Sequence, residues 1–175
     1  MILSQTAHNT YRMRGEASPR KLIKRCKNMK LKVNIKKLDE RATIPTYGSQ
    51  YAAGADLYAC LTESVTIAPS ETVLIHTGIA VELPENTVGL VYARSGLASK
   101  KDLAPANKVG VIDCDYRGEI MVAIHNHGKE ERIIEHGERI AQMVITPYYT
   151  AEYIEKDELS ETVRGQGGFG STGTK

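Results

Sequence analysis

The C-terminal segment over residues 164–173 brings together residue types that can bind phosphate. It contains five glycines, the guanidinium of Arg164 and the hydroxyls of Ser171 and Thr172. The backbone N–H groups of a glycine-rich loop, together with an Arg fork, can surround phosphate oxygens. The spacing is not that of a P-loop, so the segment predicts either another kind of anion site or a flexible terminus.

Phe169 is the only phenylalanine of the chain, and it lies inside this glycine-rich segment. Glycines are costly to order and offer nothing to pack, so no core element is expected there. An exposed ring in such a segment has a use if it stacks on a flat ligand such as a nucleobase. Phe169 therefore favours the interpretation of the segment as a lid over a nucleotide.

A second anion site is indicated by the Arg-Ser-Gly tripeptide at residues 94–96, where a short helix is predicted over 95–102. The N-terminus of a helix has free N–H groups and a dipole that favours negative charge. An ordinary helix cap by Ser95 is the alternative interpretation. Two phosphate-type sites in one chain indicate a polyphosphate ligand more strongly than either site does alone.

A third cluster, over residues 110–120, contains acids between two apolar segments. An apolar strand, then Asp113 and Asp115, then an Arg-Gly turn and a second strand predict a β-hairpin. The two carboxylates would lie on the same side of an extended chain, so one of them could act as a general base. A solvated hairpin tip is the other possibility. Asp56 lies in an apolar run, and if buried it needs a partner such as an Arg or a metal-bound water.

The elements that must position these residues are short strands. Alternation with period two predicts strands at residues 73–77, 79–83, 88–92, 119–125 and 139–145. Turn signals lie between them at residues 68–70, 83–86, 127–129 and 136–138. Turns at this spacing predict an antiparallel sandwich or barrel rather than βαβ units.

The chain has 175 residues, of which 41% are hydrophobic and 25% charged, which is enough for one domain with a core. No apolar run approaches the roughly 20 residues of a membrane span, so an integral membrane protein is excluded. The net charge of +2 is uneven, because residues 1–28 carry +6 and the remainder carries −4. The basicity belongs to a leader, so we expect no nucleic-acid partner.

We expect a basic leader at residues 1–28, a β-barrel domain at 29–150 and a C-terminal arm with the Gly-rich lid at 151–175. The leader is expected to be disordered or to precede a true start at Met29, with a transit peptide or a polyanion-binding arm as alternatives. Three widely spaced cysteines without metal-binding spacing favour a reducing, cytoplasmic setting. His125 and His127 are interpreted as part of a polar turn rather than a zinc site.

Five segments occur in an order and spacing that we recognise, namely residues 53–59, 94–98, 110–119, 138–143 and 164–173. Together they resemble the five ordered motifs of the trimeric deoxyuridine triphosphatases (dUTPases, or dUTP pyrophosphatases). The resemblance implies an all-β, jelly-roll-like β-barrel or sandwich with one short helix, forming a homotrimer with a swapped C-terminal tail. It also implies hydrolysis of dUTP to dUMP and pyrophosphate with Mg²⁺, which keeps uracil out of DNA and supplies dUMP for thymidylate synthesis.

The resemblance also implies roles for individual residues. Asp113 matches the base that activates the attacking water, and Tyr116 matches the ring that packs on the deoxyribose and excludes a 2′-hydroxyl. Asp56 matches a residue that supports Mg²⁺ indirectly through water, the metal being held mainly by the substrate phosphates. The other substrate-binding positions are Arg94, Ser95, Gly96 and Gln142 for the phosphates, Asn107, Gly110, Val111, Ile112 and Met121 for uracil, and Arg164, Phe169, Gly170, Ser171 and Thr172 for the lid.

Two other functions stay open at this stage. A dCTP deaminase has the same fold, but such enzymes carry a different Arg-Ser motif and a catalytic Glu in place of the Asp-x-Asp-Tyr segment. A module that senses dUTP without hydrolysing it belongs to a different class of protein, and the presence of Asp113 and Gln142 weighs against it.

Overall fold

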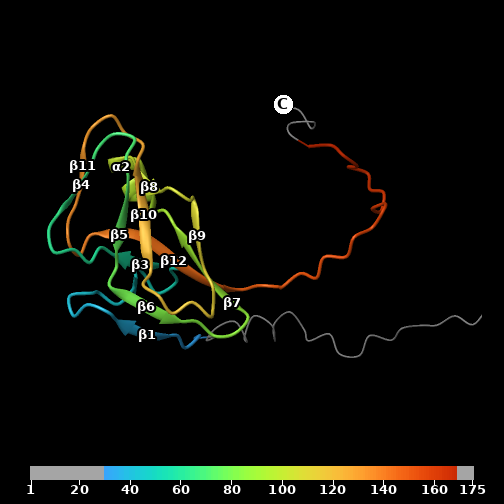
Figure 1. Cartoon of the computed structure of the whole chain (residues 1–175), viewed down its shortest axis with the longest axis horizontal. Coiled ribbons are helices and arrows are strands. Elements are labelled where there is room, and N and C mark those ends of the chain that lie inside the picture. Colours follow the sequence, from blue (N-terminus) through green and yellow to red (C-terminus); the bar gives the residue numbers. More distant parts are fainter. Residues whose placement is uncertain (1–29, 169–175) are drawn as a thin grey trace, which may run out of the picture.

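The computed structural model describes residues 30–168. The leader predicted at residues 1–28 and the lid residues Phe169, Gly170, Ser171 and Thr172 lie outside this range. The elements are, in chain order (Figure 1), β1 (Asn34–Lys37), β2 (Thr46–Tyr47), β3 (Ala55–Tyr58), β4 (Val65–Ile67), β5 (Thr72–His76), β6 (Ile79–Glu82), β7 (Thr87–Tyr92), α2 (Ser95–Lys101), β8 (Leu103–Pro105), β9 (Val109–Ile112), β10 (Met121–Asn126), β11 (Arg132–Ile134) and β12 (Arg139–Pro147).

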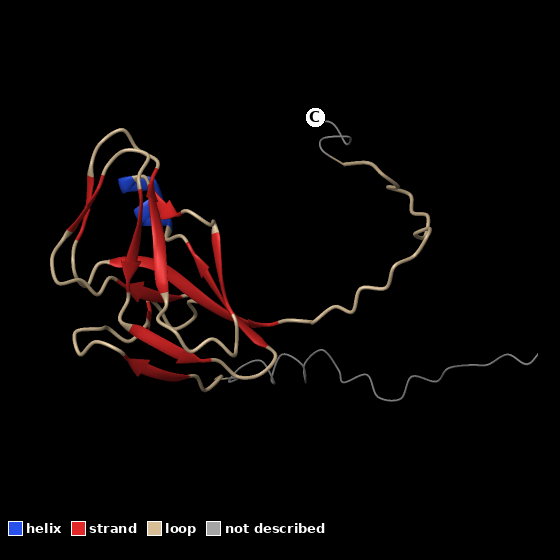
Figure 2. Ribbon diagram, in the orientation of Figure 1, coloured by secondary structure: helices blue, strands red, loops and turns tan. Residues whose placement is uncertain are grey.

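The strands pair antiparallel throughout the described chain. A five-stranded sheet has the order β2-β3-β12-β7-β9, a three-stranded sheet has the order β5-β10-β8, and β1–β6 and β4–β11 form two further pairs. Figure 2 shows the short helix α2 at one end of this body of strands. The prediction of an all-β fold with one short helix is confirmed. Between residues 30 and 168, no helix has the length and apolar character needed to cross a membrane.

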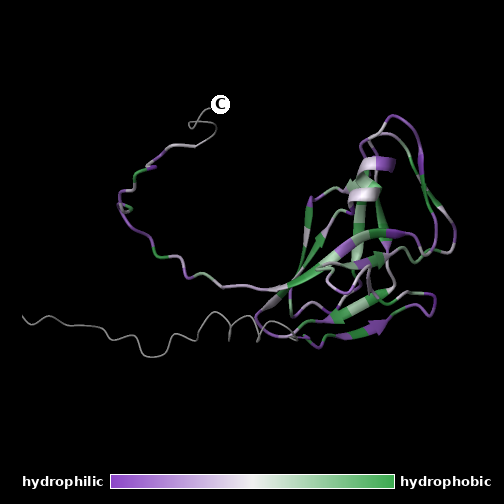
Figure 3. Cartoon of the chain, turned by 180° about the vertical axis from the view of Figure 1, so that it is seen from behind, coloured by the Kyte–Doolittle hydropathy of each residue, from purple (hydrophilic) through white to green (hydrophobic). Residues whose placement is uncertain are grey.

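The core follows the alternation of the strands. Along β10, the buried residues Val122, Ile124 and Asn126 alternate with more exposed ones. Ile124, Leu57 of β3 and Ile140 of β12 belong to one hydrophobic cluster and have no exposed surface, so the cluster joins the two larger sheets. Figure 3 shows hydrophobic residues concentrated in the strands of the body. This pattern is what period-two alternation predicts for sheets that each bury one face.

The predicted turns coincide with unusual backbone angles. Ser70, Asn86 and Gly137 have φ values of 63°, 61° and 77°, and each lies in one of the segments that turn signals marked. These residues adopt the left-handed conformation that tight reversals between strands require. The turns therefore fix where β5, β7 and β12 begin.

The hairpin predicted over residues 110–120 is wrong. β9 pairs with β7, whereas β10 pairs with β5 and β8, so residues 113–120 form a crossing segment that passes between sheets. The Tyr116 N–H donates to the Asp113 carbonyl at 3.2 Å and closes a turn, so Asp113 and Asp115 do not lie along an extended chain. Local alternation cannot distinguish a hairpin from two strands that pair elsewhere, because both bury alternate residues.

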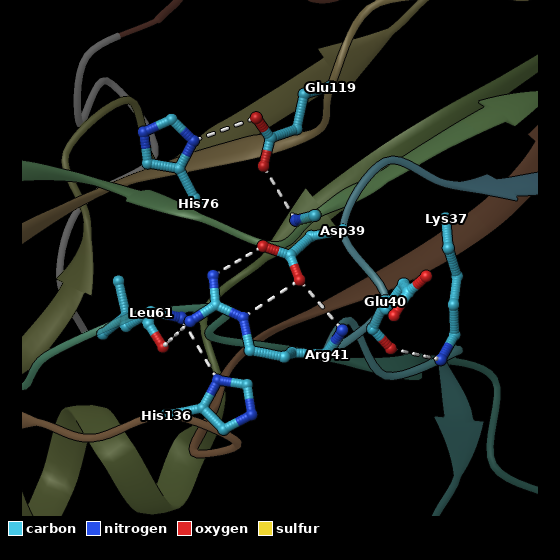
Figure 4. A network of polar contacts seen from close by, with 9 residues as sticks. Lys37, Asp39, Glu40, Arg41, Leu61, His76, Glu119 and His136 are labelled. Atoms are coloured by element: carbon cyan, nitrogen blue, oxygen red, sulfur yellow. Dashed lines mark hydrogen bonds and ion pairs between the residues drawn. The ribbon is translucent and has the colours of Figure 1, made fainter.

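The end of the crossing segment is anchored on the corner between β5 and β6. The Gly78 N–H donates to Glu119 Oε1 at 2.7 Å, and Glu119 Oε2 lies 2.9 Å from His76 Nδ1 (Figure 4). The Ile120 N–H donates to the Ile79 carbonyl at 2.9 Å. Because of these contacts, the last residues of the crossing segment have a fixed position relative to the three-stranded sheet.

Asp39 and Arg41 form an ion pair in the same region (Figure 4), and the pKa of Asp39 can be measured to test this pairing. Hydrogen bonds from the Arg41 side chain and backbone lower the pKa of Asp39 from 3.8 to about 2. Since the pKa is lower in the folded state, the stabilising contribution of the carboxylate is present above pH 3.8 and is lost as the pH falls through about 2. A carboxyl-carbon NMR titration should give the lowered pKa, and Arg41→Gln should return it toward 3.8. A value near 3.8 in the unaltered protein contradicts the prediction.

Candidate functional site

A cavity of about 190 Å³ opens where β3, β12 and the start of α2 meet. Its lining consists of Gly48, Ala52, Gly54, Asp56, Arg94, Ser95, Gly96, Arg139 and Gln142. Segments far apart in the sequence therefore converge here, and they include all the predicted phosphate-binding residues outside the lid, together with Asp56.

Asp56 on β3 is the buried acid of this cavity, with a residue exposure of 7%. The Arg94 Nε donates to Asp56 Oδ1 at 2.7 Å, and an Arg139 guanidinium nitrogen donates to Asp56 Oδ2 at 3.3 Å. A buried carboxylate requires such partners, and the prediction that a buried Asp56 is paired with an Arg is confirmed. One carboxylate between two guanidiniums leaves the cavity wall with net positive charge.

Arg94, rather than Ser95, occupies the cap position of α2. Arg94 is extended, with φ −92° and ψ 130°, and Ser95 is the first residue of the helix. The alternative interpretation, in which Ser95 caps the helix, is therefore wrong, because Ser95 is itself the first helical residue and no side chain makes a capping hydrogen bond. The first N–H groups of α2 therefore have no capping side chain, and Ser95 and Gly96 line the cavity.

Gln142 on β12 is held in the cavity wall by a hydrogen bond and by close packing. Its Nε2 donates to the Ala93 carbonyl at 2.9 Å. A Cβ atom on Gly54 would lie 2.6 Å from Gln142 Oε1, so this approach of the chain to the amide requires a residue without a side chain. The amide is thus fixed between the segment that precedes β3 and the segment that leads into α2.

Arg139 is the residue of this cavity to which sequence reasoning assigned no role. Period-two alternation would place Arg139 and Gln142, which are three residues apart, on opposite faces of β12. However, the register of β12 against β3 shifts between Arg139 and Ala141. This bulge brings Arg139 to the same cavity as Gln142. The one feature of the sequence that could have indicated this role is that Arg139 lies inside the family-like segment 138–143.

A second group of predicted residues lies at the edge strand of the same five-stranded sheet. Asp113 follows β9 and is exposed, and Tyr116 in the crossing segment is 41% exposed. Neither residue lines the cavity that contains Asp56. Asn107 lies beside Gly110, because a Cβ atom on Gly110 would be 3.5 Å from Asn107 Nδ2.

The strand β9, which carries uracil-binding candidates, pairs with one other strand in the described chain. β9 pairs through Gly110 and its neighbours with β7, and it is the last strand in the sheet order. Val111 is 61% exposed, Met121 at the start of β10 is 38% exposed, and Ile112 is partly buried against the core. The edge of the five-stranded sheet therefore presents backbone groups together with the exposed Val111, whereas Met121 belongs to the three-stranded sheet.

The described part of the C-terminal arm, residues 151–168, lies away from both groups of residues (Figure 1). Residues 151–166 are exposed throughout, and the arm extends away from the body (Figure 1). Within it, the Arg164 Nε donates to the Gly167 carbonyl at 2.8 Å, a contact inside the arm itself. A single chain therefore holds the cavity, the β9 edge and the arm as three separate parts.

Residues 30–168 contain no group of three or more His, Cys, Asp and Glu side chains that could hold a metal ion. The rings of His125 and His127 lie 4.4 Å apart between centroids in an edge-to-face arrangement. Burial, followed by the neighbouring His125, lowers the pKa of His127. His127 lies just after the end of β10, as expected for a residue of a polar turn, whereas His125 lies within β10 and pairs with Thr72.

Replacement of Asp56 by Asn should destabilise the fold. The substitution leaves two guanidiniums side by side without a charged partner, and we expect a loss of about 2 kcal/mol in the free energy of unfolding. Urea unfolding of Asp56→Asn measures it. Glu130→Gln, which removes the charge of an exposed partner of Arg132, serves as the control and should cost less. Equal losses in the two variants would contradict a special role for the buried carboxylate.

Comparisons with known proteins agree with this arrangement. The dUTPase family model matches residues 40–173. The deoxyuridine 5′-triphosphate nucleotidohydrolase of Desulfitobacterium hafniense is 52% identical over 147 residues, which are 83% of this chain and 97% of that protein. The Staphylococcus bacteriophage 80alpha dUTPase, solved with dUPNHPP, is 33% identical with a TM-score of 0.72, over 81% of this chain and 98% of that chain.

A variant dUTPase of phage phi11 of S. aureus, whose structure describes the coordination of a structural Mg(II) ion, is 28% identical with a TM-score of 0.67. That match covers 74% of this chain and 99% of the phage chain. The likeness to solved dUTPases confirms the jelly-roll-like fold. Because the family model and its relatives span most of the sequence, this chain belongs to the dUTPase family.

Proposed function

We propose that this chain hydrolyses dUTP to dUMP and pyrophosphate, which keeps uracil out of DNA and supplies dUMP for thymidylate synthesis. The observation that carries the proposal is the cavity in which Asp56 holds Arg94 and Arg139 beside the start of α2. Guanidinium groups and helix N–H groups bind phosphate oxygens through charge-assisted hydrogen bonds. Ser95, Gly96 and the Gln142 amide complete the phosphate subsite in this proposal.

The edge of β9 is the proposed subsite for uracil. Backbone groups of Gly110, Val111 and Ile112 can pair with a base as they would with a further strand. Uracil offers O4 as an acceptor and N3–H as a donor, a pattern that cytosine reverses. Asn107, beside Gly110, adds a polar contact, and Met121 adds an apolar one. The ring of Tyr116 packs on the deoxyribose and excludes a 2′-hydroxyl.

Asp113 is the proposed base. Its carboxylate, ionised at pH 7, orients a water for in-line attack on the α-phosphorus and accepts a proton from it. The bond between the water oxygen and the α-phosphorus forms as the bond from that phosphorus to the bridging oxygen breaks, and pyrophosphate leaves. The chain's part in the charge stabilisation falls to Arg94, Arg139 and the Arg164 of the lid.

Mg²⁺ is the proposed cofactor, and the residues fit a metal that is carried mainly by the substrate. Mg²⁺ prefers oxygen ligands and keeps several waters. Because both oxygens of Asp56 accept hydrogen bonds from guanidinium groups, this carboxylate supports the metal through water rather than as a direct ligand. When bound, the metal neutralises charge on the triphosphate and the leaving pyrophosphate.

We propose a homotrimer in which the arm of one subunit closes over a site of another. The exposed arm, the cavity and the β9 edge are separate in one chain, and assembly of several copies would join them. Phe169, with Gly170, Ser171 and Thr172, would then stack on uracil and contact the phosphates. We place the enzyme in the cytoplasm, in line with its three widely spaced cysteines, and propose no membrane partner. The charge of −4 outside residues 1–28 supports the proposal that it has no nucleic-acid partner.

Asp113→Asn should retain dUTP affinity and lower kcat by about 10²- to 10⁴-fold, because the amide cannot accept the proton. Pyrophosphate release measures the activity, with UTP, dCTP and dTTP as comparison substrates and Mg²⁺ present or absent. Asp115→Asn, in the same exposed turn, is the matched control and should remain active. A fully active Asp113→Asn would rule out this base, and ammonia release from dCTP would indicate a deaminase instead.

Deletion of residues 164–175 should remove most of the dUTP hydrolysis while leaving the body folded, because the body makes its core without the arm. The truncated chain retains Asp113, and the Asp113→Asn chain retains the arm. Mixed trimers of these two inactive chains therefore test whether the arm of one subunit serves the site of another. Co-expression should restore part of the activity if the arm serves a neighbouring subunit. A truncated chain with normal activity would exclude the lid, and no recovery in mixed trimers of verified composition would exclude the exchange.

A further inference from the structure

The hydroxyl end of the Tyr116 ring lies against Gly118 in the crossing segment. A Cβ atom on Gly118 would lie 2.6 Å from Cζ and 2.9 Å from Cε2 of the Tyr116 ring, and closer still to the hydroxyl oxygen. Real Cβ atoms do not approach other atoms so closely. Gly118 has no positive φ, so the absence of a side chain serves the ring rather than a special backbone conformation.

The hydroxyl of Tyr116 is also held. It donates to the Glu119 carbonyl at 3.0 Å, and the Glu119 carboxylate is in turn fixed by the Gly78 N–H at 2.7 Å. The next residue, Ile120, is also held, because its N–H donates to the Ile79 carbonyl. If a methyl group were added at position 118, the ring, which is 41% exposed, would therefore move more easily than the anchored backbone.

We propose that Gly118 and Glu119 are specificity-positioning residues that set the discrimination between deoxyribonucleotide and ribonucleotide triphosphates through the Tyr116 ring. The inference rests on the proposed function, in which this ring packs on the deoxyribose. A surface that excludes one hydroxyl group discriminates well only if it cannot retreat. The missing Cβ of Gly118 leaves room for the hydroxyl end of the ring beside the backbone, and the Glu119 carbonyl accepts its hydrogen bond, so both contacts oppose a shift of the ring that would admit a 2′-oxygen.

Gly118→Ala tests the steric part of this proposal. The ring should be displaced, and the ratio of kcat/KM for dUTP to kcat/KM for UTP should fall about tenfold or more, with a melting temperature close to that of the unaltered protein. Gly137→Asn is the control, since a Cβ atom at Gly137 would meet nothing within 4 Å and Asn tolerates its positive φ. That variant should change the ratio less than twofold. A folded Gly118→Ala that keeps the full ratio would overturn the proposal.

Two further variants separate a role through the ring from a general effect on the fold. In a Tyr116→Ala background the ring is absent, so adding Gly118→Ala should leave the ratio unchanged. A further fall of the ratio in that background would show that Gly118 acts by another route and would overturn the proposal. Tyr116→Phe keeps the ring but loses the hydrogen bond to the Glu119 carbonyl, and we expect the ratio to fall about threefold.

The same assays distinguish a failure of this inference from a failure of the proposed function. Tyr116→Phe decides the matter if Gly118→Ala does not fold, because an unchanged ratio in that variant would contradict the anchoring of the ring. An unaltered protein that releases pyrophosphate from neither dUTP nor UTP would refute the proposed function itself. Equal turnover of both substrates would leave hydrolysis intact and refute only the role of the ring in sugar discrimination.

Discussion

The Asp56 carboxylate ties together three segments that are distant in the sequence. It accepts hydrogen bonds from Arg94, the residue before α2, and from Arg139, at the start of β12. Coulomb attraction is stronger where the carboxylate is shielded from water, and an unpaired charge there is correspondingly costly. The pairing therefore both orients two cationic side chains toward the cavity and fixes where α2 begins. The proposed phosphate subsite depends on this one acid.

Two close approaches of the backbone to side chains serve the same purpose of positioning. At Gly54 the chain passes against the Gln142 amide, and at Gly118 it passes against the Tyr116 ring. In each case a polar or aromatic side chain is supported by backbone, which has less freedom to move than another side chain would have. Both supported groups belong to the proposed substrate site. Rigid support of this kind makes a site selective as well as able to bind.

The general architecture could be predicted from the sequence because it depends on local rules. Alternating apolar residues predict β10 and β12, and turn residues such as Asn86 predict the reversals between strands. The pairing of β9 could not be predicted in this way, since its partner β7 is chosen by contacts distant in the sequence. The presence of Arg139 in the cavity depends on a bulge, and a single extra residue in one strand leaves no periodic signal. Asp56 could be identified as an acid needing a partner, but only the fold specifies which guanidiniums meet it.

The charge around the cavity has the opposite sign to the net charge of the chain outside residues 1–28. A body with a net charge of −4 outside residues 1–28 would on average repel a triphosphate, so attraction must be local. Around the cavity the balance is reversed, because Arg94 and Arg139 together exceed the single buried acid. In the proposed function the arm adds Arg164, which does not line this cavity within its own chain. In the proposed function, a triphosphate would meet this additional positive charge only when the arm has closed, which would link tight binding to the closed, water-excluding state that hydrolysis needs.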